Sequence, residues 1–254
     1  MSDFPTSAKV VVIGAGIVGN CLVGHLARLG WTDLVLLDKG PLPNPGGSTG
    51  HASNFIFPVD HNKEMALLGE QSANQYRDLN LSVDSGGIEV ARTQERMDEL
   101  QRRMTSATAW GIEAHLLDPT QVKELVPFIN EDVILGGFYC PTVSVVDSLE
   151  TGTVMRKEAI EKAGCQVFAN TEVLDILTDD TPRPNSRRKV TGVVTDKGTI
   201  DAEHVVVACG VWSNQIADMA DTYIPLVPAV HQMADVGPLD VLAETNNEIG
   251  YPIV

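Results

Sequence analysis

A glycine-rich turn is the first place in this sequence where residue types and spacing could do chemistry. Gly14, Gly16 and Gly19 follow an apolar run and match the pattern G-x-G-x-x-G. In such a turn the first glycine permits a tight bend, the second lets the backbone approach a phosphate, and the third lets a helix pack closely on a strand. Ile17 and Val18 begin the helix that follows, and the free N–H groups and positive dipole end of its first turn attract an anion. The spacing therefore predicts a site for the pyrophosphate of a dinucleotide.

A carboxylate stands where the sugar of such a dinucleotide would lie. Asp38 ends a second apolar run about twenty residues beyond Gly19 and is followed by Lys39. An acid at this position accepts hydrogen bonds from a ribose 2′-OH and repels a 2′-phosphate, which disfavours NADP and leaves FAD or NAD. FAD is favoured because the chain then enters a Gly- and Ser-rich loop at 46–52 instead of another strand–helix pair. The alternative is a glycine turn of an α/β fold that binds no ligand.

Strand, turn, helix and strand are the elements that must position these residues. Apolar runs at 9–13 and 34–37 predict buried strands, and helical spacing over 17–29 ends at Gly30. Residues 41–50 are too rich in Pro and Gly for regular structure. Further along, periodicity predicts helices at 63–79, 95–109, after Asp118 and at 149–162, and strands at 88–91, 166–169, 172–177, 189–195 and 204–208.

The run at 204–208 resembles the one at 9–13, and we expect it to be a second fully buried strand beside the first. The intervening chain must then leave the sheet and return. We therefore expect an α/β fold in which residues 1–84 form the first part of a nucleotide-binding domain, 85–165 an inserted α+β lobe, 166–222 the second part of the domain, and 223–254 the start of another segment of the lobe.

Composition excludes several classes of protein. The 254 residues carry a net charge of −16, which opposes nucleic-acid binding, and no apolar stretch reaches the roughly 20 residues of a membrane span. No secretory leader is recognisable at the start, so we expect a cytoplasmic protein.

The four cysteines are widely separated and the histidines lack metal spacing, so we expect reduced thiols and no metal site. The basic run at 183–189 is predicted to be a solvated loop, with a binding patch as the alternative.

The loop Gly46-Gly47-Ser48-Thr49-Gly50-His51-Ala52 resembles the segment of the dimethylglycine and sarcosine dehydrogenase/oxidase family in which a histidine is bonded covalently to FAD. The similarity extends over nearly the whole chain and points to the bacterial oxidases of that family. Its other matching segments are Trp31 and residues 86–91, 109–113, 134–137, 210–212 and 225–232.

The resemblance implies a fold and a set of roles. The fold is a Rossmann-type FAD domain like that of glutathione reductase and the amine oxidases, with an inserted substrate lobe. His51 would attach the flavin and His231, in the segment PLVPAVHQ, would be the active-site histidine. The other implied cofactor contacts are Gly14, Gly16, Ile17, Val18, Gly19, Asp38, Lys39, Gly47, Ser48, Thr49, Gly210, Trp212 and, through its backbone, Val173.

The implied reaction is oxidation of a secondary or tertiary N-methyl amine, such as dimethylglycine or sarcosine, with O₂ or an electron-transfer protein as the final acceptor. Relatives continue beyond the equivalent of Val254, often through a region that binds tetrahydrofolate, so we expect a fold incomplete at the C-terminus and a fragment inactive by itself. A non-catalytic flavin-binding or regulatory module, like the regulatory subunit of pyruvate dehydrogenase phosphatase, is the alternative, and a histidine at position 51 argues against it.

One segment departs from the family pattern. Where relatives carry P-x-D-G, this chain reads Pro141-Thr142-Val143-Ser144 and so lacks a turn glycine. The conformation of this turn is therefore not predicted by the resemblance.

Overall fold

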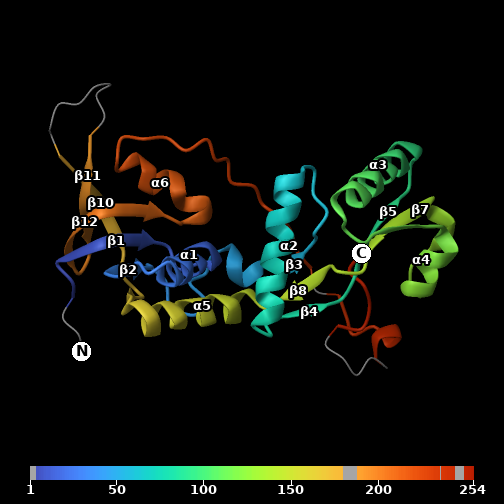
Figure 1. The fold of residues 1–254 in the computed structure, drawn as a ribbon, viewed down its shortest axis with the longest axis horizontal. Coiled ribbons are helices and arrows are strands. Elements are labelled where there is room, and N and C mark those ends of the chain that lie inside the picture. The colour runs from blue at the N-terminus through green and yellow to red at the C-terminus, as the bar shows by residue number, and fades with distance from the viewer. Residues whose placement is uncertain (1–3, 180–187, 235, 244–248) are drawn as a thin grey trace. The chain divides into compact units, whose positions relative to one another are not determined.

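The computed structural model describes residues 4–179, 188–234, 236–243 and 249–254 (Figure 1). Of the basic run at 183–189, only Arg188 and Lys189 fall within these residues. The chain forms two compact units, Met1–Ala52 with Ser148–His231 (unit 1) and Ser53–Asp147 with Gln232–Val254 (unit 2).

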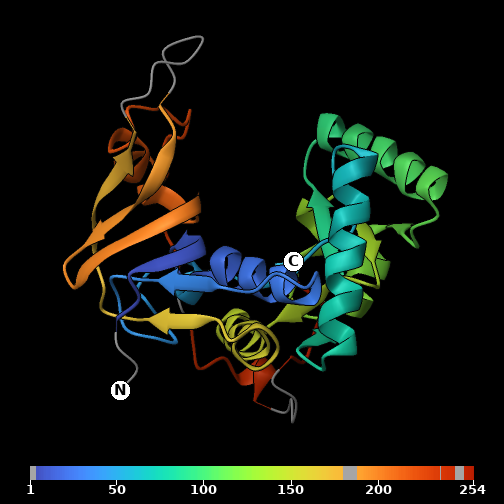
Figure 2. The same ribbon diagram turned by 60° about the vertical axis from the view of Figure 1, so that its left-hand side comes forward.

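Unit 1 is built on a six-stranded sheet in the order β10-β11-β12-β1-β2-β9. The strands β12, β1, β2 and β9 run parallel, and β10 and β11 join β12 as an antiparallel ribbon (Figure 2). Their bounds are β1 Ser7–Ile13, β2 Leu34–Leu37, β9 Gln166–Phe168, β10 Val173–Thr178, β11 Val190–Thr195 and β12 Gly198–Val207. The expected α/β architecture is thus present.

The predicted return of the chain to its first strand is confirmed. Val12 on β1 lies opposite Val206 on β12, and Ile13 lies opposite Val207. The prediction that this strand is fully buried was wrong, because Glu203 and His204 are exposed and the three valines after them are only partly buried. Residues 199–203 of β12 alternate between exposed and buried positions, whereas Val205 and Val206 pack, partly buried, against the two different core clusters.

Two helices pack side by side on one face of this sheet. α1 (Ile17–Arg28) and α5 (Ser148–Ala163) contact each other along their lengths, α5 being drawn in yellow and α1 in blue in Figure 1. Val23 and Ala27 of α1 and Ala159 of α5 share a buried cluster with residues of β1 and β2. The short helix α6 (Ser213–Asp218) packs Ile216 against the cluster on the opposite face. The sheet is therefore the middle layer of unit 1.

Unit 2 contains two small antiparallel sheets, β3-β8-β4 and β5-β7-β6, with helices α2, α3 and α4. Phe138 of β7 is fully buried against Leu100 of α3. The bounds are β3 Phe55–Ile56, α2 Lys63–Asp78, β4 Ser82–Asp84, β5 Gly87–Ala91, α3 Gln94–Trp110, β6 His115–Leu117, α4 Pro119–Leu125, β7 Gly136–Cys140 and β8 Ser144–Val146. This is the α+β composition expected of the inserted lobe.

Two helix ends lie where capping residues in the sequence predict them. The Asp118 carboxylate accepts a hydrogen bond from the Gln121 N–H at 2.9 Å, and the Gln121 side chain accepts one from the Asp118 N–H, which completes a capping box around Pro119. Gly111 ends α3 in the left-handed conformation with φ +76°.

The boundaries of the compact units differ from those expected at 84/85 and 165/166. α2 belongs to unit 2, whereas α5 belongs to unit 1 because it packs on α1. Within the segment expected to be irregular, Ser48–His51 forms one turn of 3-10 helix.

Among the helices of the described part, none is both long enough and apolar enough to cross a membrane.

Candidate cofactor site

The turn between β1 and α1 needs glycine at two of its three motif positions. Gly14 has φ +104°, and a Cβ there would lie 2.4 Å from the Ala208 carbonyl oxygen. A Cβ at Gly19 would lie only 1.8 Å from the Gly14 carbonyl oxygen. At both positions another stretch of backbone lies where a side chain would be. The predicted tight turn and close helix packing are therefore confirmed.

Asp38 lies directly beside this turn. Its Oδ2 accepts a hydrogen bond from the Ala15 N–H at 2.6 Å and its Oδ1 accepts one from the Gly40 N–H at 2.8 Å. The Asp38 backbone is fixed as well, since its N–H donates to Phe168 O and its carbonyl accepts from Thr171 N–H. A partly buried carboxylate is therefore held at the mouth of α1, in the place that the sequence predicts.

The Gly- and Ser-rich loop reaches the same helix start. The Ile17 N–H donates to Thr49 Oγ1 at 2.9 Å, and the Thr49 carbonyl accepts from Ser148 Oγ at 2.6 Å. The loop is thereby tied both to the first turn of α1 and to the first residue of α5. His51 ends the 3-10 turn two residues later and is exposed.

These residues fit the ADP portion of a dinucleotide. Gly16 is the N-cap of α1 and has no side chain to cap it, and the first turn carries no acidic residue that would repel a phosphate. A Cβ at Gly16 would lie 3.1 Å from Thr49 Oγ1 and would crowd the loop. Beyond the Ile17 N–H, which Thr49 accepts, the first turn of α1 offers the Val18 N–H to an anion, while Asp38 offers an acceptor for a sugar hydroxyl.

Other expected contact residues gather at the ends of neighbouring strands. The Lys39 ammonium lies 5.3 Å from the ring centroid of Trp212, and a Cβ on Gly47 would lie 3.6 Å from the same ring. Gly210, with φ +52°, and Trp212 form the short turn that follows β12. Val173 begins β10 with its side chain in the core.

The structure does not connect His231 to this group. It is exposed, lies in a stretch without helix or strand, and forms no hydrogen bond or ion pair within the described residues. Its catalytic role therefore remains a prediction.

Sequence reasoning missed Ser148, Asn20 and Arg156. The Asn20 amide donates to the Ala15 carbonyl at 2.6 Å and accepts from the Arg156 Nη1 at 3.1 Å. The polar Asn20 on the helix face that packs against α5 was the available signal, since a buried amide requires partners.

The four cysteines are free, and burial favours the neutral thiol form of Cys165 and Cys209. Burial chiefly, and then the negative charge of Asp38, raises the pKa of the Cys209 thiol to about 11, and this thiol donates to Ile13 O at 3.2 Å. Burial raises the pKa of Cys165 to about 12. In the part of the chain that is described, no cluster of three His, Cys, Asp or Glu side chains could hold a metal ion.

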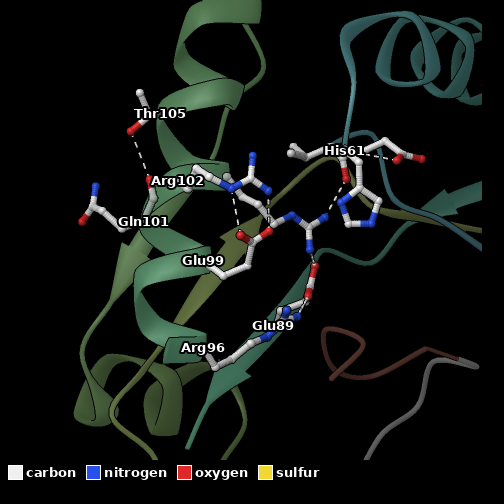
Figure 3. A network of polar contacts seen from close by, with 10 residues as sticks. His61, Glu89, Arg96, Glu99, Gln101, Arg102 and Thr105 are labelled. Carbon is white, nitrogen blue, oxygen red and sulfur yellow. Dashed lines mark hydrogen bonds and ion pairs between the residues drawn. The ribbon is translucent and has the colours of Figure 1, made fainter. Parts of the chain in front are cut away.

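Unit 2 contains a cavity of about 390 Å³, lined among others by Phe55, Phe57, His61, Glu89 and Arg103. A polar network lies beside this cavity. Glu89 pairs with Arg96, both labelled in Figure 3, and also with Arg103, whose Nη2 donates to Val59 O at 2.7 Å. The Arg103 guanidinium also lies 5.6 Å from the ring centroid of Phe57. Glu89 is the shared counter-charge of both arginines, which is the pattern of a structural network, although within the described residues the buried Arg103 Nε has no hydrogen-bond partner.

The parallel sheet of unit 1 and the site formed by the glycine turn and Asp38 are those of a flavoprotein that binds FAD. The chain belongs to the FAD-dependent oxidoreductase family, which it matches over residues 9–254.

Within that class the similarity to individual proteins is as follows. The chain is 33% identical over 237 residues to the mitochondrial sarcosine dehydrogenase of Mus musculus, an alignment that covers 89% of this chain and 25% of that protein. It is 29% identical over 251 residues to the mitochondrial regulatory subunit of pyruvate dehydrogenase phosphatase from Mus musculus, covering 95% and 27%. The chain thus spans about a quarter of the length of these relatives.

The crystal structure of L-proline dehydrogenase from P. horikoshii has the same fold. It superimposes with a TM-score of 0.77 at 24% sequence identity, over 86% of this chain and 57% of that one.

Proposed function

We propose that this chain is part of an FAD-dependent oxidoreductase that oxidises a secondary or tertiary N-methyl amine of the sarcosine or dimethylglycine type. One observation carries the proposal: two side chains from separate motifs meet at the start of α1, where Asp38 accepts from the Ala15 N–H of the glycine turn and Thr49 accepts from the Ile17 N–H. The similarity to sarcosine dehydrogenase supports the substrate class.

The residues divide by the part of FAD that each would hold. The Val18 N–H would bind the pyrophosphate beside Ile17, whose own N–H is held by Thr49, and Asp38 would accept from the adjoining ribose. The Val173 backbone would contact the adenine, with Lys39 and Trp212 beside the nucleotide. The loop at 47–49 would lie toward the flavin, and Gly210 would leave room at the end of β12. All of these residues belong to unit 1, so we assign nucleotide binding to unit 1 and the substrate lobe to unit 2.

We assign the two remaining roles to histidines. His51 would form the covalent bond to the flavin, which the exposed position of its side chain permits. His231 would accept a proton from the amine, since the ordinary pKa of histidine lies close to neutral pH. When bound, FAD supplies the acceptor for a hydride from the N-methyl carbon.

The later steps involve partners outside this chain. Electrons would pass on to O₂ or an electron-transfer protein. The one-carbon unit would leave as formaldehyde or, where a folate-binding region is present, pass to tetrahydrofolate.

Acid precipitation of the full-length protein tests flavin attachment. A yellow pellet with a flavin spectrum is expected from the wild type and a colourless one from His51→Ala. A colourless wild-type pellet would remove the covalent bond from the proposal.

Anaerobic mixing with sarcosine or dimethylglycine tests the reaction. The flavin absorbance should be bleached in the wild type and in the control His115→Ala, which changes an exposed histidine of unit 2, whereas His231→Ala should retain FAD and lose bleaching. A wild-type protein that holds FAD but is bleached by neither amine would favour the non-catalytic regulatory module, which the similarity to the phosphatase regulatory subunit also supports.

A further inference from the structure

Arg156, a partly buried cation between α1 and α5, forms no ion pair within the part of the chain that the structure describes. Arg156 on α5 is partly buried, and its Nη1 and Nη2 donate to Asn20 Oδ1 at 3.1 Å and Thr153 Oγ1 at 3.3 Å. Both partners are neutral. Burial lowers the pKa of Arg156, and no carboxylate in the described ranges forms an ion pair with it. Removing a cation from water without an anion is costly, so its position requires an explanation.

Asn20 links this cation to the glycine turn. Its side chain is 2% exposed, and its Nδ2 donates to the Ala15 carbonyl at 2.6 Å while its Oδ1 accepts from Arg156. Both ends of the amide are engaged, so its orientation is fixed. Ala15 lies between Gly14 and Gly16, so a chain of two hydrogen bonds joins the guanidinium to the turn.

The helix α5 is shaped to leave room for this link. A Cβ at Gly152 would lie 2.9 Å from Asn20 Nδ2. Glycine inside a helix costs about 1 kcal/mol relative to alanine, and here any side chain would displace the Asn20 amide. Gly24 of α1 makes a similar close approach, because a Cβ there would lie 2.6 Å from the Met155 side chain. The two helices therefore meet closely at the place where Asn20 and Arg156 touch.

We propose that Asn20 and Arg156 are positioning residues for the cofactor phosphates. Asn20 holds the Ala15 carbonyl, which keeps the N–H groups of the first turn of α1 directed at the anion, and the pyrophosphate supplies the negative charge that Arg156 otherwise lacks. This inference rests on the proposed function, since it requires a dinucleotide at the turn.

The test compares ligands that differ only in phosphate. Full-length apoprotein carrying His51→Ala, so that no flavin is retained covalently, is titrated with adenosine and with ADP. Arg156→Met should weaken ADP binding about tenfold and leave adenosine binding unchanged. The reason is that it removes the positive charge and the hydrogen bond through which Arg156 acts on Asn20. Arg156→Lys should restore ADP affinity to within about threefold, because it retains the charge.

Two further variants separate this role from packing. Asn20→Asp keeps the shape of the side chain but removes the donor to Ala15, and it should also weaken ADP binding selectively. Arg28→Met is the matched control, because Arg28 bridges the same two helices through Glu158 but has no link to the turn. It should lower the unfolding midpoint and leave the ADP-to-adenosine affinity ratio unchanged.

The outcomes are distinct. If the starting protein binds neither ADP nor FAD, the proposed function fails and the inference fails with it. If it binds ADP and Arg156→Met, folded by circular dichroism, binds ADP equally well, the inference alone is wrong. Equal losses for adenosine and ADP would show a packing role and would also overturn it.

Discussion

The carboxylate of Asp38 lies 2.6 Å from the backbone nitrogen of Ala15, although 23 positions separate the two residues. The parallel register of β1 and β2 brings them together, since the last residues of the two strands, Ile13 and Leu37, lie opposite each other. The acid and the glycine turn are therefore parts of one site at the carboxyl edge of the sheet, where ligands of open α/β folds bind.

If Asp38 binds the ribose as proposed, Asp38→Asn should weaken binding of both adenosine and ADP by about tenfold, because both ligands share this sugar. Titration of the full-length apoprotein measures this. Asp201→Asn is the control, since Asp201 is exposed and lies opposite Ser7 at the other end of the sheet. Unchanged adenosine affinity in Asp38→Asn would contradict the ribose assignment.

Gly19→Ala should abolish FAD binding and destabilise the protein by more than about 2 kcal/mol, because the new methyl carbon would lie 1.8 Å from the Gly14 carbonyl oxygen. Urea unfolding and flavin content report the two effects. Gly69→Ala is the matched control within a helix of unit 2: its nearest contact would be an ordinary 3.7 Å, so the protein should be unchanged or slightly stabilised. A stable, flavin-binding Gly19→Ala protein would disprove the close helix–turn contact.

Glu158→Gln should lower stability at pH 7 by about 1 kcal/mol, an amount limited by solvent screening of the pair. The hydrogen bond from Arg28 is the main cause that lowers the pKa of Glu158 from 4.5 to about 2, although burial opposes it. A lowered folded-state pKa stabilises the protein above the unfolded value, and this contribution disappears as the pH falls from about 4.5 toward 2. Urea unfolding at pH 7 and pH 3 should therefore show a smaller difference at the lower pH.

Glu161→Gln on the same helix is the control for this pH dependence. Glu161 pairs with Lys157 at 3.8 Å, and both side chains are well exposed. Its substitution should have no measurable effect at either pH. An effect of Glu158→Gln that is independent of pH would contradict the ion-pair explanation.

Glu89→Gln should destabilise unit 2 by about 2 kcal/mol, because Glu89 is the carboxylate shared by Arg96 and Arg103 and the Arg103 side chain is only 11% exposed. Thermal unfolding followed by circular dichroism checks this. Glu99→Gln, which breaks an exposed pair with Arg102 on the same surface of α3, should leave the midpoint unchanged. If the two variants unfold alike, the network around the cavity has no structural role.

Much of the site could be predicted from sequence because its signals are local. The glycine spacing, the apolar runs and the acid at position 38 all act within one strand–helix–strand unit, and β12 was identified by its apolar run. The link between Thr49 and Ile17 could not be derived from spacing, since it depends on how a loop without periodic pattern folds back. The burial of β12 was overestimated because an apolar run does not reveal how completely its two faces are covered.

The assignment of α2 and α5 to a compact unit could not be predicted from the sequence either. Both were recognised as helices, but the unit to which each belongs depends on packing between distant segments, such as Gly24 against Met155. The turn at 141–143 needed no glycine after all, because none of these residues has a positive φ and the Val143 N–H closes the turn on Cys140 O. The family pattern alone gave no means of foreseeing this.

A crystal structure of the full-length protein with its flavin bound is the most direct test of the account. We expect the pyrophosphate within hydrogen-bonding distance of the backbone nitrogen of Val18, and the Asp38 carboxylate on the adenosine ribose. A pyrophosphate bound elsewhere, or a ribose that leaves Asp38 without contact, would contradict it.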